Sequence, residues 1–295
     1  MDEKSFESFR ENAERNRMFI RAAAHKQLAA EQKKQVDDAL ERSKKAHEDI
    51  YKVQKALEAA KIPFVIFKTL NNHPDMGDDV DFLVAGKDLS TTRDTIIEKF
   101  NGRIKPQSMA STLAGKVSII IGDSPITVEI HGGGFSQIGE YGIQVEPTIK
   151  HSRVVKLFGM EFRVPSNEDM LLIDVMHRIY RHMSIRYSDV YNTKKLLGEE
   201  RLDWVYVLET VEQAGMMPGL ILFLDVVKKY GDDIGTLGKF PYFVGKRDFL
   251  KNYFAKVLSD ALHLRVASLL RMLTIYPALL VLESLFGKHI KNTFW

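Results

Sequence analysis

Two carboxylates one residue apart, Asp79 and Asp81, lie in a strand-like run at the end of the segment Phe64–Val84 and limit what this part of the chain can form. Asp79 and Asp81 are separated by a single residue in the run DDVDFLV. Side chains two positions apart leave a β-strand from the same face, so both acids can reach one divalent cation while Val80 and Phe82 pack into a core. The segment therefore predicts a strand with one apolar face and one acidic face.

A third carboxylate, Glu129, occupies a second strand-like run. Lys116–Ile121 and Ile126–His131 flank the turn sequence GDSP, which predicts a β-hairpin with Glu129 on its second arm. Acids that converge from neighbouring strands suit a two-metal phosphoryl or nucleotidyl transfer site, because the metals hold the attacking and the leaving oxygens. We predict that Asp79, Asp81 and Glu129 are the catalytic and metal-binding residues of such a site.

Each acid also has a plainer interpretation. Asp79 and Asp81 could be solvated at a strand edge or paired with a lysine such as Lys68, and an outward-facing glutamate is common on alternating strands. Two acids on one face raise each other's pKa unless a cation lies there, and the rest of the run is apolar. This argument favours metal binding for Asp79 and Asp81, while both interpretations of Glu129 stay open.

Composition narrows the classes of protein to which the chain can belong. With 295 residues, 45% of them hydrophobic, it can bury a substantial core and is expected to form two lobes. A net charge of +3 neither requires nor excludes nucleic acid as a partner. The absence of cysteine excludes disulfides, thiolate metal sites and cysteine nucleophiles.

The remaining patterns predict an α+β fold, in which a small mixed sheet is flanked by N-terminal helices and by a helical C-terminal lobe. Ser5–Ala60 contains neither proline nor glycine and is rich in helix-forming residues. Arg153–Leu157 and Met160–Val164 predict a second hairpin, and Ser166 begins a capping-box sequence after which the pattern is helical. The predicted domains are an N-terminal helical region at 1–45, a sheet domain at 46–165 and a helical domain at 166–295.

The helix predicted over Ser166–Ser184 is basic. Its i,i+4 pairs, which place positive charge on adjoining stripes, are His177 with Arg181 and Arg178 with His182. Residues 150–195 contain an excess of Lys and Arg over acids, so this region could receive a triphosphate or an RNA backbone. The alternative is a solvated face on which Asp189 neutralises a neighbouring arginine. The two histidines lie five positions apart rather than four, which argues against a zinc site.

The C-terminal segment is unusually apolar. Charged residues and a proline interrupt Leu262–Phe286, so no unbroken run reaches the ~20 residues that a bilayer requires. Core packing or a homodimer interface is the simplest interpretation, and a helix lying on a membrane, with Lys288 and Lys291 near the headgroups, is the alternative. The N-terminus mixes charges where a secretory signal would be apolar, which predicts a cytoplasmic protein.

Several motifs occur in an order that resembles a known family. They are KIPFVIFK, DDVDFLV, VEIHGG, SNEDMLLIDVMHRIYRH and DWVYVLETVEQAG. Over roughly Ala46–Gly231 the chain resembles the nucleotidyltransferase superfamily with the DNA polymerase β-like catalytic fold, and within it the uncharacterised nucleotidyltransferase family. The resemblance implies that the domain at 46–165 is catalytic. The residues at the family's motif positions are Lys68, Asp79, Asp81, Glu129 and His131.

The resemblance implies a magnesium-dependent enzyme that transfers NMP from an NTP to an acceptor hydroxyl or phosphate and releases pyrophosphate. The three acids would hold two Mg²⁺ ions. The residues expected to bind the nucleotide are Lys68, Thr69, His131, Arg178 and Arg181. The acceptor, which is a small molecule, a tRNA or a protein, stays open because the same catalytic lobe suits all three.

The loop after the first predicted strand departs from the family pattern. Superfamily members commonly have Gly-Ser or Gly-Gly there, which lets backbone amides approach the triphosphate, whereas this chain has Thr69-Leu70. Thr69 could still supply a hydroxyl group. The departure keeps a second function open, namely a catalytically inactive module that binds nucleotide, RNA or a protein partner.

Overall fold

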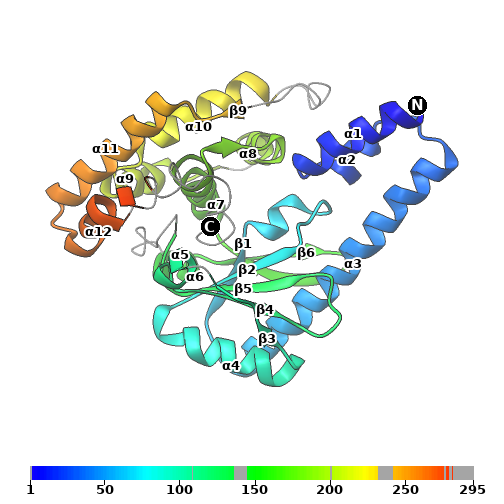
Figure 1. The fold of residues 1–295 in the computed structure, drawn as a ribbon, viewed down its shortest axis with the longest axis horizontal. Coiled ribbons are helices and arrows are strands. Elements are labelled where there is room, and N and C mark those ends of the chain that lie inside the picture. The colour runs from blue at the N-terminus through cyan, green and yellow to red at the C-terminus, as the bar shows by residue number, and fades with distance from the viewer. Residues whose placement is uncertain are drawn as a thin grey trace.

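The computed structural model describes residues 2–107, 109–135, 145–199, 201–231 and 242–275, together with positions 277, 278 and 281. A five-stranded sheet lies at the centre, and helices pack on both of its faces (Figure 1). This arrangement confirms the predicted α+β class with a small mixed sheet.

The sheet has the strand order β1-β2-β5-β4-β3. Its strands are β1 Phe64–Phe67, β2 Asp79–Val84, β3 Arg103–Ile104, β4 Lys116–Ile120 and β5 Thr127–His131. β2 is parallel to β5, and every other neighbouring pair is antiparallel. The two strands that carry the predicted acids are therefore direct neighbours in the middle of the sheet.

One face of the sheet is an apolar core. Ile66, Phe82 and Val128 are fully buried on this face. They pack with residues of α3 (Ala30–Ala59) and α4 (Leu89–Phe100). In Figure 1, α4 lies below the sheet, and α3 runs diagonally from the upper right toward that side. Because side chains alternate along a strand, the two acids of β2 emerge on the opposite face.

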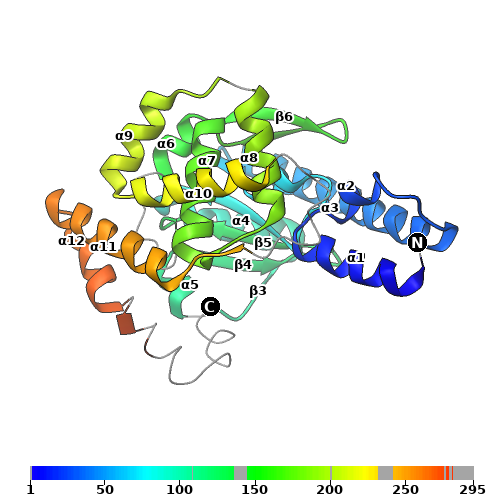
Figure 2. The same cartoon turned by 90° about the horizontal axis from the view of Figure 1, so that it is seen from above.

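The acidic face lies beneath the C-terminal helices. Val65 and Leu83 of this face share a second core with Leu172 of α7 (Asn167–Val175). Figure 2, which looks down on the sheet, shows α7 and its neighbours above the strands. Any site formed by the acids therefore lies between the sheet and the helical lobe.

The N-terminal helices α1 (Glu3–Arg15) and α2 (Phe19–Ala23) contribute to the same core as the C-terminal helices. The long helix α3 runs unbroken through residues 45 and 46, so the N-terminal region and the sheet region share one helix. The division of the chain at 1–45, 46–165 and 166–295 stays a prediction.

The remaining elements complete the helical lobe and the connections. They are η1 Thr69–Asn72, η2 Gly86–Asp88, α5 Met109–Leu113, α6 Val145–Lys150, β6 Arg153–Leu157, β7 Met160–Val164, η4 Met176–His182, β8 Ser184–Ile185, α8 Tyr187–Glu199, α9 Trp204–Ala214, α10 Met217–Tyr230, β9 Tyr242–Phe243, α11 Lys246–Leu262, α12 Val266–Leu270 and η6 Arg271–Ile275. β6 and β7 pair as the predicted second hairpin.

The predicted basic helix is not a regular α-helix. It begins as expected, with the Ser166 hydroxyl accepting a hydrogen bond from the Asp169 amide, but η4 is a π-helix. A π-helix bonds each residue to the fifth one along, so His177 faces His182 with ring centroids 4.4 Å apart. The prediction of a regular α-helix over Ser166–Ser184 was therefore wrong beyond Val175, where the helix widens to π-helical spacing.

Within the described ranges, no helix combines the length and the apolar composition needed to cross a bilayer. Lys288 and Lys291, on which the predicted membrane contact depends, lie outside the described residues. The predictions of peripheral membrane contact, of a homodimer and of a cytoplasmic location stay predictions.

Candidate active site

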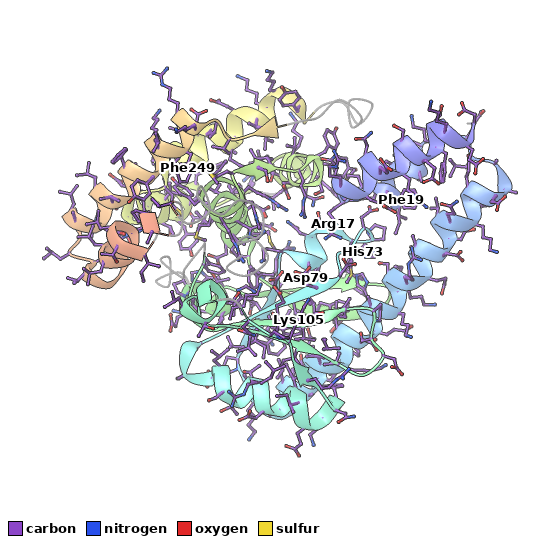
Figure 3. All side chains as sticks on the ribbon, in the orientation of Figure 1. Arg17, Phe19, His73, Asp79, Lys105 and Phe249 are labelled. Carbon is purple, nitrogen blue, oxygen red and sulfur yellow. The ribbon has the colours of Figure 1, made fainter. Side chains whose placement is uncertain are left out.

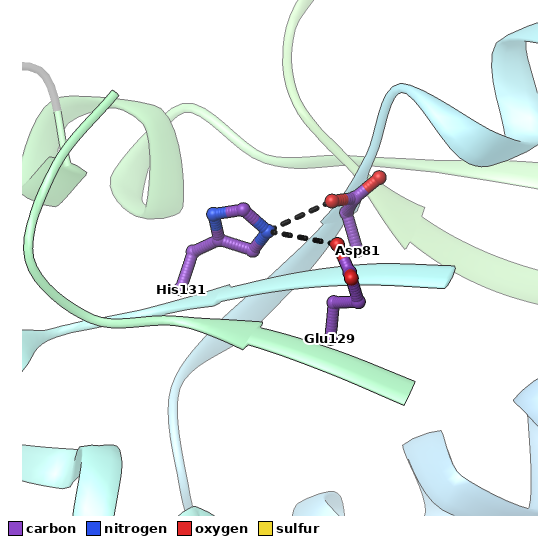
Figure 4. A group of neighbouring side chains, drawn as sticks. All are labelled: Asp81, Glu129 and His131. Carbon is purple, nitrogen blue, oxygen red and sulfur yellow. Dashed lines mark hydrogen bonds and ion pairs between the residues drawn. The ribbon is translucent and has the colours of Figure 1, made fainter. Parts of the chain in front are cut away.

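The three predicted acids meet on one face of two neighbouring strands. Asp79 and Asp81 begin β2, and Asp81 lies opposite Glu129 of β5 in the parallel register. His131 follows on β5, and its Nε2 atom is 2.8 Å from Asp81 Oδ1 and 3.9 Å from Glu129 Oε2 (Figure 4). Acids far apart in the sequence thus converge as the strand pattern predicts.

Asp81 is the most enclosed of the three acids, with 4% of its surface exposed. Its Oδ1 atom is 2.8 Å from Lys68 Nζ, and its amide donates to the Thr69 hydroxyl at 3.2 Å. Burial alone would raise the pKa of Asp81, but Lys68 and His131 outweigh it and hold this pKa well below its usual range. Asp81 is therefore a charged group held in a preformed position.

His131 is neutral in this arrangement. Burial lowers the pKa of His131 to about 4, so at pH 7 only one ring nitrogen carries a proton. Because Nε2 faces the Asp81 carboxylate, we assign the proton to Nε2, which donates to Asp81. The histidine thus orients the acid without adding charge.

Glu129 has two partners that do not belong to the motifs, Lys116 and Ser118. It forms an ion pair with Lys116, and the Ser118 hydroxyl donates to its Oε1 atom at 3.2 Å. The predicted hairpin contained the signal for both residues, because pairing its arms from the GDSP turn places Ser118 opposite Glu129 and Lys116 opposite His131. The register of this hairpin identifies the cation beside the third acid.

Asp79 differs from the other two acids. Among the described residues, no cation lies within ion-pair distance of its carboxylate. Burial raises the pKa of Asp79, and the charges of Asp81 and Glu129 raise it further. This crowding of like charge is what a bound cation would relieve.

The residues present suit a divalent cation. Asp81 and Glu129 each offer a carboxylate oxygen, and these oxygens lie within 4.8 Å of each other and of a ring nitrogen of His131. Carboxylate oxygens are the ligands that Mg²⁺ prefers in proteins. Asp79 could add a further oxygen from the same strand, so the donor set fits the metal that the resemblance implies.

Lys68 joins β1 to the loop in an unusual conformation. Its backbone has φ 60° and ψ −55°, which non-glycine residues rarely adopt and which costs on the order of 1–3 kcal/mol. Burial lowers the pKa of Lys68, and the nearby charges of Arg181 and Lys116 lower it further, while Asp81 opposes them. The strained turn directs the lysine toward the acids rather than toward solvent.

The other predicted nucleotide ligands divide into two groups. Arg181 lines a small cavity of about 10 Å³ together with Lys68 and His131. Arg178 instead is buried, with its guanidinium 2.8 Å and 2.6 Å from the two carboxylate oxygens of Asp189. The structure therefore brings Lys68, His131 and Arg181 together and engages Arg178 elsewhere. The Thr69 hydroxyl faces β2.

Two histidines hold the loop that leads to the acids. His47 Nδ1 lies 2.8 Å from the Ser43 carbonyl oxygen and must donate to it, so His47 Nε2 accepts from His73 Nδ1 at 3.1 Å. The Ser43 hydroxyl also donates to the Pro74 carbonyl at 2.7 Å. These bonds fasten the loop before Asp79 to α3.

This histidine pair predicts a loss of stability in mild acid. Burial lowers the pKa of His47, and burial with the His47 and Arg21 charges lowers that of His73 to about 4, against about 6.5 in an unfolded chain. Between pH about 4 and about 6.5 the unfolded state therefore binds more protons than the folded state. The free energy of unfolding consequently falls as pH falls through this range. Urea unfolding at a series of pH values should show this fall, and His73→Gln should flatten it. An equal slope in that variant would contradict the assignment, and His25→Gln, at an exposed histidine, is the control.

Comparison with known proteins agrees with the geometry. No curated protein matches the chain. A family model described as uncharacterised nucleotidyltransferase matches residues 14–232, which is well over half of the chain and includes every residue of the site. The chain belongs to the uncharacterised nucleotidyltransferase family.

Proposed function

We propose that this protein is a metal-dependent nucleotidyltransferase that transfers NMP from an NTP to an acceptor hydroxyl or phosphate. The observation that carries the proposal is the alignment of Asp81 with Glu129 across two parallel strands, with Asp79 on the same face. Membership of the family supports nucleotidyl transfer in general. The metal, the NTP and the acceptor are the proposed details.

In the proposed reaction an acceptor oxygen forms a bond to the α-phosphorus while the bond to the bridging oxygen breaks, and pyrophosphate leaves with that oxygen. The acceptor's proton passes to solvent. The chemistry supplied by bound Mg²⁺, two ions in this proposal, is neutralisation of phosphate charge and activation of the acceptor oxygen. Asp79, Asp81 and Glu129 hold the ions, and catalysis is mostly positioning and charge neutralisation.

Neighbouring side chains have supporting roles. Lys68 and Arg181 contact the phosphates, since both are cations at the edge of the site. His131 orients Asp81 by donating its Nε2 proton. Arg178 is left out of the nucleotide ligands because its guanidinium is bonded to Asp189.

One observation favours the second function, a catalytically inactive binding module. Lys68 and Lys116 already neutralise Asp81 and Glu129, so both lysines would have to move away before these acids could hold a metal ion. The cavity beside Lys68 has a volume of about 10 Å³, which is too small for a phosphate group unless η4 moves. An inert module would retain these ion pairs and bind its ligand elsewhere.

The two functions are separated by label transfer. The pure protein is incubated with α-labelled NTPs, Mg²⁺ and a cell extract, and compared with the double variant Asp79→Asn/Asp81→Asn. Transfer of label by the wild type and its loss in the variant are expected. The exposed turn residue Asp123 provides a matched control, Asp123→Asn, which should transfer at the wild-type rate. Transfer that persists in the double variant contradicts the assignment, and absence of both transfer and metal binding in the wild type favours the inert module.

A further inference from the structure

A pocket of about 520 Å³ lies beside the acids, between the N-terminal helices and the loop that leads to β2. Ligand pockets in proteins are commonly of this size. Apolar side chains, Phe19 and Met76 among them, share its walls with polar and charged groups, and Arg17 and Arg42 add two cations. None of the proposed catalytic residues lines this pocket, so it is separate from the metal site.

Arg17 is placed at this pocket by an unusual backbone. α1 ends in a Schellman motif, with the Arg17 amide donating to the Glu14 carbonyl at 2.9 Å and the Met18 amide to the Ala13 carbonyl at 2.8 Å. Arg17 therefore occupies the left-handed position, at φ 54°, where glycine is the usual residue. An arginine at this position has an unfavourable backbone conformation, but its side chain reaches the loop.

The guanidinium of Arg17 lies against the loop. Its Nη1 atom donates to the Met76 carbonyl at 3.2 Å. A Cβ atom built on Gly77 would lie 2.8 Å from Arg17 Nη2, so glycine at position 77 lets the guanidinium lie directly against the loop. Figure 3 shows Arg17 extending from the N-terminal helices toward the segment that carries Asp79.

Arg17 lacks a counter-ion in the part of the chain that the structure describes, where no carboxylate lies within 4.0 Å of it. The buried carboxylate of the pocket, Asp75, is neutralised by Arg21 at 2.8 Å. Glu14 and Asp78 also line the pocket, but both are exposed to solvent and its screening. A half-buried guanidinium that has a hydrogen bond to a carbonyl but no counter-ion among the described residues suits an anionic group on a ligand.

The pocket adjoins the proposed reaction centre. Asp78, which lines it, directly precedes Asp79. Ile126 lines it just before β5 and precedes Thr127, which is the register partner of Asp79. The pocket therefore lies next to the residues with which β2 and β5 begin, Asp79 among them.

We propose that this pocket binds the acceptor of the transfer reaction, and that the acceptor is a small molecule with an apolar body and an anionic group that Arg17 binds. The role of this molecule as the acceptor rests on the proposed function. The prediction that the pocket binds a molecule with an anionic group does not depend on that function. Arg42, exposed on α3 across the pocket, is a second and weaker contact.

Phenyl phosphate, which combines an apolar ring with a phosphate, is the probe. Its binding is measured by calorimetry with EDTA and without NTP. Arg17→Gly removes the guanidinium and relieves the left-handed backbone, so this variant should be at least as stable as the wild type. Its affinity for phenyl phosphate should nevertheless fall about tenfold or more, as expected for loss of a hydrogen bond to a charged group.

Lys61 provides a matched control. It occupies the same motif at the end of α3, with φ 57° and with Lys61 and Ile62 amides donating to the Glu58 and Leu57 carbonyls. Lys61→Gly should raise stability as Arg17→Gly does and bind phenyl phosphate like the wild type. Wild-type affinity in Arg17→Gly, or no binding by the wild type, would overturn the pocket assignment. Binding lost in Arg181→Gln but kept in Arg17→Gly would place the anion at Lys68 instead and would also overturn it.

The acceptor role has its own readout. In the label-transfer assay, Arg17→Gly should raise the KM for the acceptor and leave binding of the labelled NTP unchanged. Loss of NTP binding in this variant would identify the pocket as a nucleotide site and overturn the acceptor assignment. Absence of transfer by the wild type would remove both the proposed function and the acceptor role, while the calorimetric result would still decide whether the pocket binds anions.

Discussion

Asp79→Asn should reduce nucleotidyl transfer by about 10²–10³-fold while leaving the protein at least as stable as the wild type. Burial and the charges of Asp81 and Glu129 raise the pKa of Asp79, so its ionised form is disfavoured in the folded protein. A neutral, nearly isosteric amide relieves this repulsion but supplies one metal ligand fewer. The measurements are the rate of label transfer and the urea midpoint of unfolding.

The neighbouring acid is the informative comparison. Asp81→Asn removes the counter-charge of the buried Lys68 amine, and breaking a buried pair from one side costs about 3–5 kcal/mol. Loss of activity in Asp81→Asn is therefore accompanied by loss of stability, which Asp79→Asn avoids. A wild-type transfer rate in Asp79→Asn would contradict the proposed metal site. A large fall in the urea midpoint of this variant would contradict the inferred repulsion of Asp79 by Asp81 and Glu129.

Arg178→Gln should lower the free energy of unfolding by about 3–5 kcal/mol, because it leaves the buried carboxylate of Asp189 without its partner. Both carboxylate oxygens of Asp189 face the Arg178 guanidinium, at 2.8 Å and 2.6 Å. Asp189 also accepts from the Arg186 amide at 2.7 Å, so the pair fixes the start of α8. Urea unfolding measures the loss.

Arg181→Gln is the control for this prediction. Arg181 is half-buried and lines the cavity beside Lys68. The free energy of unfolding of the variant should therefore lie within about 0.5 kcal/mol of the wild-type value. Its transfer rate should fall, because a phosphate contact is lost. If Arg178→Gln were instead stable and inactive, the result would support the prediction from the sequence that Arg178 binds the nucleotide.

Patterns of short range in the sequence predicted much of the fold and of the site. The run DDVDFLV contains the predicted strand, β2, and GDSP joins the two strands of the expected hairpin. Alternation within the strand assigned Asp79 and Asp81 to one face, whereas the register that adds Glu129 to this face came from the structure. The strands and their alternation depend on neighbouring residues and on the period of a strand, and both are visible in the sequence.

Other features depended on contacts between distant residues. The π-helix η4 turns His177 toward His182, and the spacing of an ordinary helix does not predict this. Arg178 was an equal candidate with Arg181 until tertiary packing placed Asp189 beside it. The sequence did not indicate Arg17 as a binding residue. A helix-terminal arginine is a candidate only once the structure places it next to the loop at Gly77.

The sequence by itself determined which residues could form an acidic strand face, because strand periodicity is a local property of the chain. It also determined the family to which the chain belongs, because the motifs and their order are retained. Only the tertiary structure decided which cation meets which acid, and that a pocket opens beside Asp79. The reason is that ion pairs and cavities are formed by side chains from separate elements, whose approach is set by the packing of two cores on opposite faces of one sheet.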